Sequence, residues 1–451
     1  MLGTGTGTTH RSLLMTTTAV AALVATMGAA SAGGFAIREQ SAMYQGMSFA
    51  GNAAGGALSS MFWNSAATAS RDGFNTELSF SIISADSKVT TTGVDTSQFS
   101  LDPLTNGLIA GVFAGADPSS GDIGPPAFVP SSYGTYQISK NVFVGMAVNA
   151  PFGLETDPTN YNYQGSVIAQ KTELLTYNYN PTVAIRITPG ITIGAGVQIQ
   201  TAEGRFSFAT LTPVSNPFLP SVAGQSTTVE GNGWGFGGTA GVMIDATPTT
   251  RIGVGYRSQI DQDIDGHIST EGALVQATNT TLKLPDMVTV SIHQVVSPVL
   301  RLNGTFEWTN WSRFESLTVT AAESGASVLG AAAAGTTIAS LPFNWSDGYF
   351  VSAGAEYDIY PYLTGRAGIA YEWSPIDSAE KRSTGIPDAN RTWLSGGFSW
   401  AFTPTTTIDF AYSHLFVEDA AFDRTSLSRI NVTGNVESKI DIVSLGVKTH
   451  W

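Results

Sequence analysis

The chain has 451 residues, a formal net charge of −14 and no cysteine. The lack of cysteine excludes disulfide bonds, thiol nucleophiles and zinc–thiolate sites, and the negative charge argues against a nucleic-acid partner. Charged residues make up only 12% of the chain, whereas soluble domains carry about 25%. Because no apolar run after the first 32 residues is long enough for a membrane helix, this low charge favours strands that cross a membrane.

Residues 1–32 have the pattern of an export signal. Arg11 precedes an apolar stretch from Leu13 to Met27, and the small residues Ala30-Ser31-Ala32 follow as a cleavage site. The apolar stretch is too short for a membrane anchor and contains threonines. We therefore predict a signal peptide over residues 1–32 and an exported mature chain.

Residues 33–72 show no alternation and are rich in alanine, serine and glycine. Large apolar side chains are scattered among them, and an exported segment of this kind must be buried somewhere. A disordered periplasmic tail would carry fewer aromatic residues. We predict that this segment is a hatch, held in the lumen of a barrel formed by residues 73–451. Its large side chains are Phe35, Ile37, Met43, Tyr44, Met47, Phe49, Met61, Phe62 and Trp63.

From residue 73 onward, apolar and polar residues alternate with period two. Ile191 and Ile193, for example, are separated by Thr192, so that one face suits lipid and the other a polar lumen. This pattern predicts an all-β fold, a transmembrane antiparallel β-barrel of about fourteen strands with the hatch inside it. The predicted strands are 74–90, 128–139, 141–151, 172–187, 190–208, 231–246, 250–264, 279–295, 299–312, 346–358, 361–374, 390–403, 406–418 and 438–451.

The connections between these strands alternate short and long, and several short ones contain proline. Short turns belong on the periplasmic side of such barrels and long loops outside, so an even number of strands places both chain ends in the periplasm. Aromatic residues near the strand ends suit a membrane interface. They are Tyr256, Trp308, Trp311, Tyr357, Tyr360, Tyr362, Tyr371, Trp373, Trp400 and Tyr412, and the chain itself ends in Trp451.

Several motifs resemble, in order, those of the FadL/TodX family of outer-membrane channels for long-chain fatty acids and other hydrophobic compounds. The resemblance covers essentially the whole mature chain. In the hatch, Asn64-Ser65-Ala66 stands where the family has Asn-Pro-Ala, so a fixed φ angle is lost at Ser65. Other matching segments include Gly34-Phe35-Ala36-Ile37-Arg38-Glu39-Gln40-Ser41, Asn149-Ala150-Pro151-Phe152-Gly153-Leu154, Leu282-Lys283-Leu284-Pro285-Asp286-Met287, Trp308-Thr309-Asn310-Trp311-Ser312-Arg313-Phe314 and Gly385-Ile386-Pro387-Asp388-Ala389-Asn390-Arg391-Thr392-Trp393-Leu394-Ser395.

The resemblance implies a fourteen-stranded barrel with a hatch, capture of an apolar ligand between extracellular loops, and sideways release through a gap at a kinked third strand. Pro151 lacks a backbone donor and Gly153 permits a bend, so a kink over Pro151, Phe152 and Gly153 would leave neighbouring strands unpaired. The alternative is that Pro151 ends the strand at its outer rim. The residues alone leave these alternatives open, and the resemblance favours the kink.

Candidate ligand-binding residues lie in and after the fifth predicted strand. Counting from Ile199 directs Phe206 and Phe208 toward the lumen, and the loop that follows carries Phe218 and Leu219, which suit either ligand capture or packing on the barrel. The resemblance implies a carboxylate-binding arginine near Arg205. Since the same count directs Arg205 toward lipid, this role requires a bulge, for which Gly204 is the candidate.

The sequence therefore predicts a channel of the bacterial outer membrane for passive uptake of long-chain fatty acids. A channel for aromatic or aliphatic hydrocarbons is the alternative in the same class. An open porin is argued against by the apolar hatch, and a lipid-modifying enzyme by the lack of a recognisable catalytic array around the few histidines. The expected partners are a hydrophobic small molecule, outer-membrane lipid and lipopolysaccharide, with the protein a monomer and no metal or cofactor.

Overall fold

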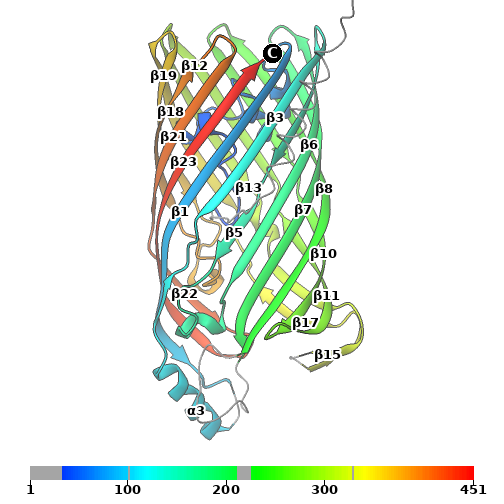
Figure 1. The fold of residues 1–451 in the computed structure, drawn as a ribbon, viewed down its shortest axis with the longest axis vertical. Coiled ribbons are helices and arrows are strands. Elements are labelled where there is room, and N and C mark those ends of the chain that lie inside the picture. Colours follow the sequence, from blue (N-terminus) through cyan, green and yellow to red (C-terminus); the bar gives the residue numbers. More distant parts are fainter. Residues whose placement is uncertain (1–32, 100–101, 211–224, 328–329) are drawn as a thin grey trace, which may run out of the picture.

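The structure, a computed structural model, describes residues 33–99, 102–210, 225–327 and 330–451. The predicted signal peptide lies outside these residues. The strands form a closed antiparallel barrel with fourteen wall positions (Figure 1). Closure results from pairing of the first strand, β1 (Phe74–Asp95), with the last, β23 (Asn431–His450). The all-β barrel prediction is thus confirmed.

Each wall position is either one strand or two strands in line. The single strands are β1, β3 (Ala127–Ser139), β6 (Thr172–Thr188), β7 (Ile191–Thr210), β8 (Gln225–Thr247), β19 (Leu363–Trp373), β20 (Arg391–Ala401) and β23. The interrupted positions are β4 (Val142–Asn149) with β5 (Gly153–Thr156), β9 (Thr250–Arg257) with β10 (Ile260–Thr270), β12 (Met287–Ser297) with β11 (Ala273–Leu284), β13 (Leu300–Thr309) with β14 (Ser316–Ala321), β18 (Gly348–Tyr360) with β17 (Thr337–Pro342), and β21 (Thr406–Val417) with β22 (Ala420–Thr425).

Short turns gather at the barrel end that carries the C-terminus, and the longer connections extend from the other end (Figure 1). One predicted long connection is wrong. β10 and β11 run past the expected loop and meet in a tight turn at Glu271 and Gly272, whose φ angles of 50° and 75° suit a hairpin. Elements of the connections are α3 (Pro103–Ala114), β2 (Ser119–Asp122), η3 (Gln164–Val167), η4 (Trp311–Arg313), β15 (Gly325–Ser327), β16 (Gly330–Ala332) and η5 (Ala379–Lys381).

No helix among the described residues is long and apolar enough to cross a membrane.

Successive side chains along each strand point to opposite faces of the wall. On β7, Ile191 and Ile193 are exposed on the outer face, whereas Gln198 and Gln200 are buried inside. An apolar outer face of this kind matches the hydrocarbon layer of a membrane. Among the aromatic residues expected at the interface, Trp311 is an exception. It is buried in the lumen, because the wall strand is interrupted there by η4.

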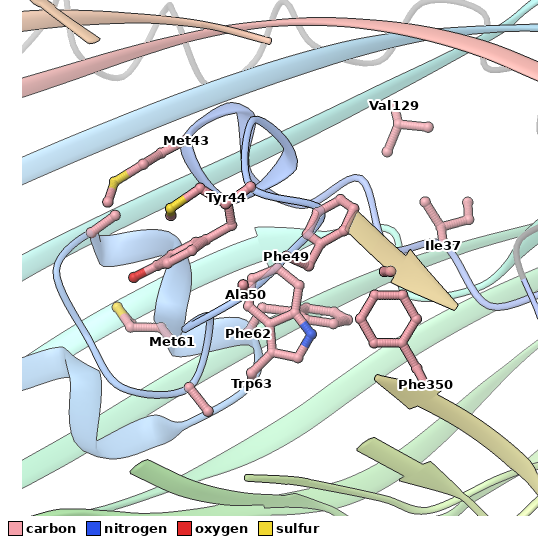
Figure 2. Packing of buried hydrophobic residues seen from close by; sticks show 14 of the residues in the cluster. Ile37, Met43, Tyr44, Phe49, Ala50, Met61, Phe62, Trp63, Val129 and Phe350 are labelled. Atoms are coloured by element: carbon pink, nitrogen blue, oxygen red, sulfur yellow. The ribbon is translucent and has the colours of Figure 1, made fainter. Parts of the chain in front are cut away.

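Residues 33–72, here called the inner segment, lie within the barrel (Figure 2). Their short helices are α2 (Ala42–Gln45), η1 (Leu58–Phe62) and η2 (Ser65–Ala69). Trp63 packs against Tyr44, Phe49 and Phe62 with ring centroids 6.0, 5.9 and 5.0 Å apart. The segment thus forms the central apolar core of the molecule.

Glycines of the wall let the backbone of the inner segment approach closely. At Gly255 of β9, a Cβ atom would lie less than 3.0 Å from the carbonyl oxygen of Trp63. At Gly241 of β8, it would lie equally close to the side chain of Asn64. The glycine-rich inner face therefore exists because these positions leave space only for hydrogen.

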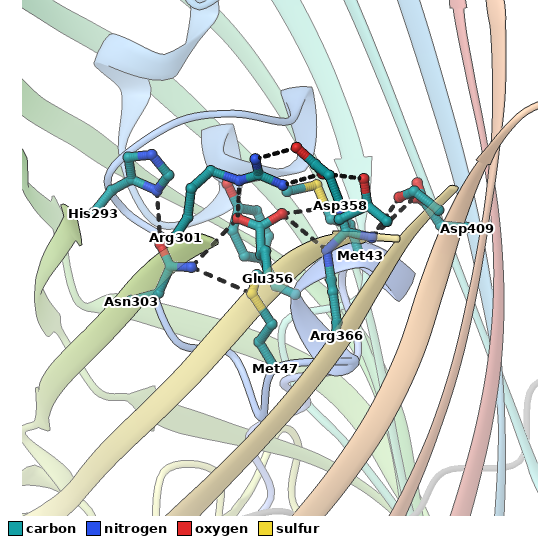
Figure 3. A network of polar contacts seen from close by, with 12 residues as sticks. Met43, Met47, His293, Arg301, Asn303, Glu356, Asp358, Arg366 and Asp409 are labelled. Carbon is teal, nitrogen blue, oxygen red and sulfur yellow. Dashed lines mark hydrogen bonds and ion pairs between the residues drawn. The ribbon is translucent and has the colours of Figure 1, made fainter. Parts of the chain in front are cut away.

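A polar network lines the wall beside the inner segment, toward the short-turn end (Figure 3). Arg301 makes two contacts of 2.7 and 2.6 Å with Asp358, and Arg366 lies 3.0 Å from Glu356. Asn303 donates to Glu356 over 3.3 Å. Because the charges are paired across neighbouring strands, their burial is far less costly than that of isolated charges.

Candidate functional site

An apolar cavity, here called the outer cavity, occupies the long-loop half of the barrel. The space between its lining atoms, including the gaps among side chains and the open mouth, amounts to about 1420 Å³. Aliphatic and aromatic side chains from several wall strands form most of its surface, as expected for a site that takes a hydrophobic ligand. These include Leu154, Leu174, Phe206, Phe208, Val229, Ile264, Ile268, Leu282, Phe314, Leu317, Val319, Leu341, Phe343 and Ile386.

The start of the inner segment also lines this cavity. Phe35 lies in a cluster of aromatic rings, 4.6 Å from Trp311, 5.4 Å from Phe314 and 5.6 Å from Trp345, measured between ring centroids. Phe152 of the third wall position is 6.1 Å away. These neighbours come from places where wall strands are interrupted, so the breaks provide room for the cluster.

The structure separates the candidate ligand residues. Phe206 and Phe208 line the outer cavity, with ring centroids 5.6 Å apart. The predicted bulge at Gly204 is wrong, because β7 pairs through it with β6 and β8 without a register shift. The Arg205 side chain is consequently half exposed, and its Nε lies 3.7 Å from Glu230 on the neighbouring strand.

Two further candidates, Phe218 and Leu219, lie outside the described residues.

The Asn64-Ser65-Ala66 motif is buried against the wall. Asn64 precedes η2 and its side-chain oxygen accepts from the Ala66 amide. Its side-chain nitrogen donates to the carbonyls of Ala53 (2.7 Å) and Val242 (3.0 Å). Ser65 donates to Thr239 over 2.7 Å. Hydrogen bonds to β8 thus hold this turn in place, although Ser65 lacks the fixed φ of proline.

On the side that faces β3, the wall is unpaired at Pro151, Phe152 and Gly153. β4 ends at Asn149, and β5, which starts at Gly153, pairs with β6 on one side. Among the described residues, β5 has no ladder to β3, whose pairing with β4 begins only at Ser132. Instead, the Ile37 amide donates to the Pro151 carbonyl and the Gly153 amide to the Phe35 carbonyl, both over 2.9 Å.

Gln40 of the inner segment joins the two sides of this stretch. Its backbone carbonyl accepts from Ser131 (2.9 Å) and Tyr133 (3.0 Å) of β3. Its side-chain nitrogen donates to the carbonyl of Ala150, at the end of β4, over 2.8 Å. The inner segment therefore closes the wall where the strands themselves do not.

A buried charge cluster surrounds the same part of the inner segment. Arg38 lies 2.6 Å from Glu307 and 3.1 Å from Glu372. Arg391 pairs with Asp388, which also accepts from the Gly34 amide over 2.8 Å. The sequence contained a signal for this cluster, since charged residues are rare in so apolar a segment, but it did not indicate their partners.

Glu39 lies beside this cluster with one carboxylate oxygen buried and without a hydrogen-bond partner among the described residues. Burial raises the pKa of Glu39 to about 7, and the nearby Glu372 adds to the rise, whereas Arg38 and Arg391 oppose it. The Glu39 carboxyl therefore changes charge near neutral pH.

A closed barrel with an apolar outer belt, an internal N-terminal segment and an apolar cavity above that segment defines an outer-membrane transport channel. The chain matches the family described as outer membrane protein transport protein (OMPP1/FadL/TodX) over residues 21–451. It belongs to this family, which confirms the resemblance. The protein is accordingly located in the bacterial outer membrane, and its family consists of transport proteins rather than enzymes.

Similar proteins match most of the chain. Outer membrane protein P1 of Haemophilus influenzae is 29% identical, covering 98% of this chain and 99% of its own. The long-chain fatty acid transport protein of Escherichia coli is 27% identical over 70% of this chain and 76% of its own. The crystal structure of a Pseudomonas aeruginosa FadL homologue superposes with a TM-score of 0.78 at 20% identity, covering 92% of this chain and 99% of the other, and shows the same fold.

Proposed function

We propose that this protein takes up long-chain fatty acids across the outer membrane by passive diffusion. The outer cavity supplies an apolar surface open toward the long loops. The fatty acid transport protein of Escherichia coli, with 27% identity, supports this ligand class. The observation that carries the proposal is that one segment both lines the cavity, through Phe35, and closes the wall, through Gln40.

The proposed route follows from this double role. An acyl chain enters the outer cavity and packs against the aromatic cluster around Phe35. Its binding favours arrangements in which the first residues of the inner segment leave Pro151 and Gly153, since those arrangements offer the chain more apolar contact. The ligand then passes sideways between β3 and β5 into the bilayer. Residues 33–72 act as the hatch in this mechanism.

The unpaired stretch of the wall is tested by replacing Pro151 with a residue that has a backbone N–H group. We expect Pro151→Val to straighten the third wall position and to lower oleate uptake by cells severalfold, while oleate binding to purified protein stays close to wild type. Pro181→Val is the matched control, because Pro181 lies in β6 with Met146 opposite it on β4. Equal uptake by Pro151→Val and wild type would contradict release through the gap.

We further propose that the protein works as a monomer. The sheet closes on itself, and among the described residues the inner segment covers the break in strand pairing from Pro151 to Gly153. Outer-membrane lipid and lipopolysaccharide then contact the apolar belt all around the barrel. Cross-linking in intact membranes tests this state, with a single band of monomer size expected and a ladder of oligomers contradicting it.

A further inference from the structure

Two arginines border the outer cavity, Arg205 with its side chain on the outer face of the wall and Arg424, and they differ in what neutralises them. Arg205 has Glu230 as an ion-pair partner. Arg424, near the end of β22, donates to the backbone carbonyls of Glu380 and Pro342, the latter over 2.8 Å. Backbone carbonyls accept hydrogen bonds but carry no net charge. Arg424 is thus a partly buried cation that is held in place without being neutralised.

The chain offers Arg424 no carboxylate. None of the described acidic side chains forms an ion pair with Arg424, whose partners are backbone carbonyls. Lys381 and Arg391, in contrast, are paired with Asp377 and Asp388. The segments outside the description, residues 1–32, 100–101, 211–224 and 328–329, contain neither aspartate nor glutamate. An anionic partner for Arg424 would therefore come from outside the protein.

The position of Arg424 fits a ligand with one anionic end. Pro342, which holds the guanidinium, lies between Leu341 and Phe343, and both of these side chains line the outer cavity. An arginine has five N–H donors, and two carbonyls leave donors for a carboxylate. Thr425, the next residue, lines the same cavity and adds a hydroxyl.

We propose that Arg424 binds the carboxylate of the ligand in the outer cavity, so that the ligand class is a monoanionic amphiphile rather than a neutral hydrocarbon. This inference rests on the proposed uptake function, and it assigns the headgroup end of the same cavity. The acyl chain then extends from Arg424 along the cavity toward Phe35.

The test compares oleate with oleyl alcohol, which has the same chain but no charge, by equilibrium binding to the detergent-purified full-length protein. Wild type is expected to bind oleate about tenfold or more tightly than the alcohol, because hydrogen bonds to charged groups are the strong ones. Arg424→Gln should remove that preference and leave alcohol binding within about twofold of wild type. Lys381→Gln is the matched control and should leave both affinities unchanged, because Lys381 is already paired with Asp377 and does not line the cavity.

The alternative role of Arg424 is purely structural, a brace between β22 and the carbonyls of Glu380 and Pro342. If Arg424 has only this structural role, Arg424→Gln should weaken the binding of oleate and of oleyl alcohol equally. That result would overturn the inference. Equal binding of the two ligands by wild type would also overturn it while leaving the uptake of hydrophobic compounds intact. Binding of neither ligand by wild type would contradict the proposed function itself.

Discussion

Arg38 joins the inner segment to the wall through two carboxylates. Replacing it by methionine leaves Glu307 and Glu372 buried without their cation. We expect Arg38→Met to destabilise the seated inner segment by about 3–5 kcal/mol, the cost of breaking a buried ion pair from one side. Single-channel recording should show larger or more frequent ion conductance than in wild type.

Arg186→Met is the control for this prediction. Arg186 also touches the inner segment, pairing with Asp72 over 2.6 Å, but the carboxylate of Asp72 is largely exposed. Exposed pairs contribute about 0–1 kcal/mol, so conductance should stay near wild type. If Arg38→Met conducts no more than Arg186→Met, the buried pairs do not hold the segment in place.

We expect the seating of the inner segment to depend on pH through Glu39. Its pKa of about 7 when seated lies above its ordinary value of 4.5, so the seated state holds the proton more tightly. This contribution to stability is complete below about pH 4.5 and is lost as the pH rises through about 7. Conductance bursts should therefore be more frequent at pH 8 than at pH 5.

Glu39→Gln isolates this effect, because glutamine keeps the shape and cannot ionise. The variant should lose most of the change in conductance between pH 5 and pH 8. An unchanged pH profile in Glu39→Gln would assign the dependence to other groups.

The sequence predicts the direction of a side chain correctly where the alternation along a strand determines that direction. Parity correctly directed Phe206 and Phe208 inward and Arg205 outward, and the bulge invoked at Gly204 to turn Arg205 inward is absent. Arg424 went unnoticed because its significance depends on Pro342 and Glu380, which are distant in sequence. Period-two counting carries no information about such contacts.

At the scale of elements, glycines of the wall determine how closely the inner segment fits. A side chain at Gly255 would meet the Trp63 carbonyl. We expect Gly255→Val to displace the inner segment from β9 and raise ion conductance, while the barrel still assembles in the membrane. Gly134→Val on β3, where a Cβ would meet no atom within 4 Å, is the control and should behave as wild type. Closed channels in Gly255→Val would contradict the account.

The strands themselves could be read from the sequence, since each must present apolar residues to lipid at every second position. The breaks within them could not. Alternation continues through Ser258 and Gln259, where β9 gives way to β10, so one strand was predicted. Pro151 and Pro285 were local signals of a break, but the aromatic cluster around Phe35, which occupies the space, is assembled from distant parts of the chain.

For the whole molecule, the wall and the inner segment are each incomplete alone. The wall has an unpaired stretch between β3 and β5, and the inner segment supplies the missing hydrogen bonds through Ile37 and Gln40. In the proposed mechanism, a ligand that displaces the start of the segment opens the wall beside it. The mechanism thus couples the cavity to the gap through a single segment.

The most direct test locks the two parts together. Ala36 and Phe152 face each other in an antiparallel bridge, a geometry that accepts a disulfide, and the natural chain has no cysteine to interfere. The variant Ala36→Cys with Phe152→Cys should bind oleate yet lose uptake when oxidised, and regain uptake under reductant, whereas Phe152→Cys alone should not respond to reductant. Equal uptake by the oxidised and reduced forms would contradict the claim that the inner segment must move.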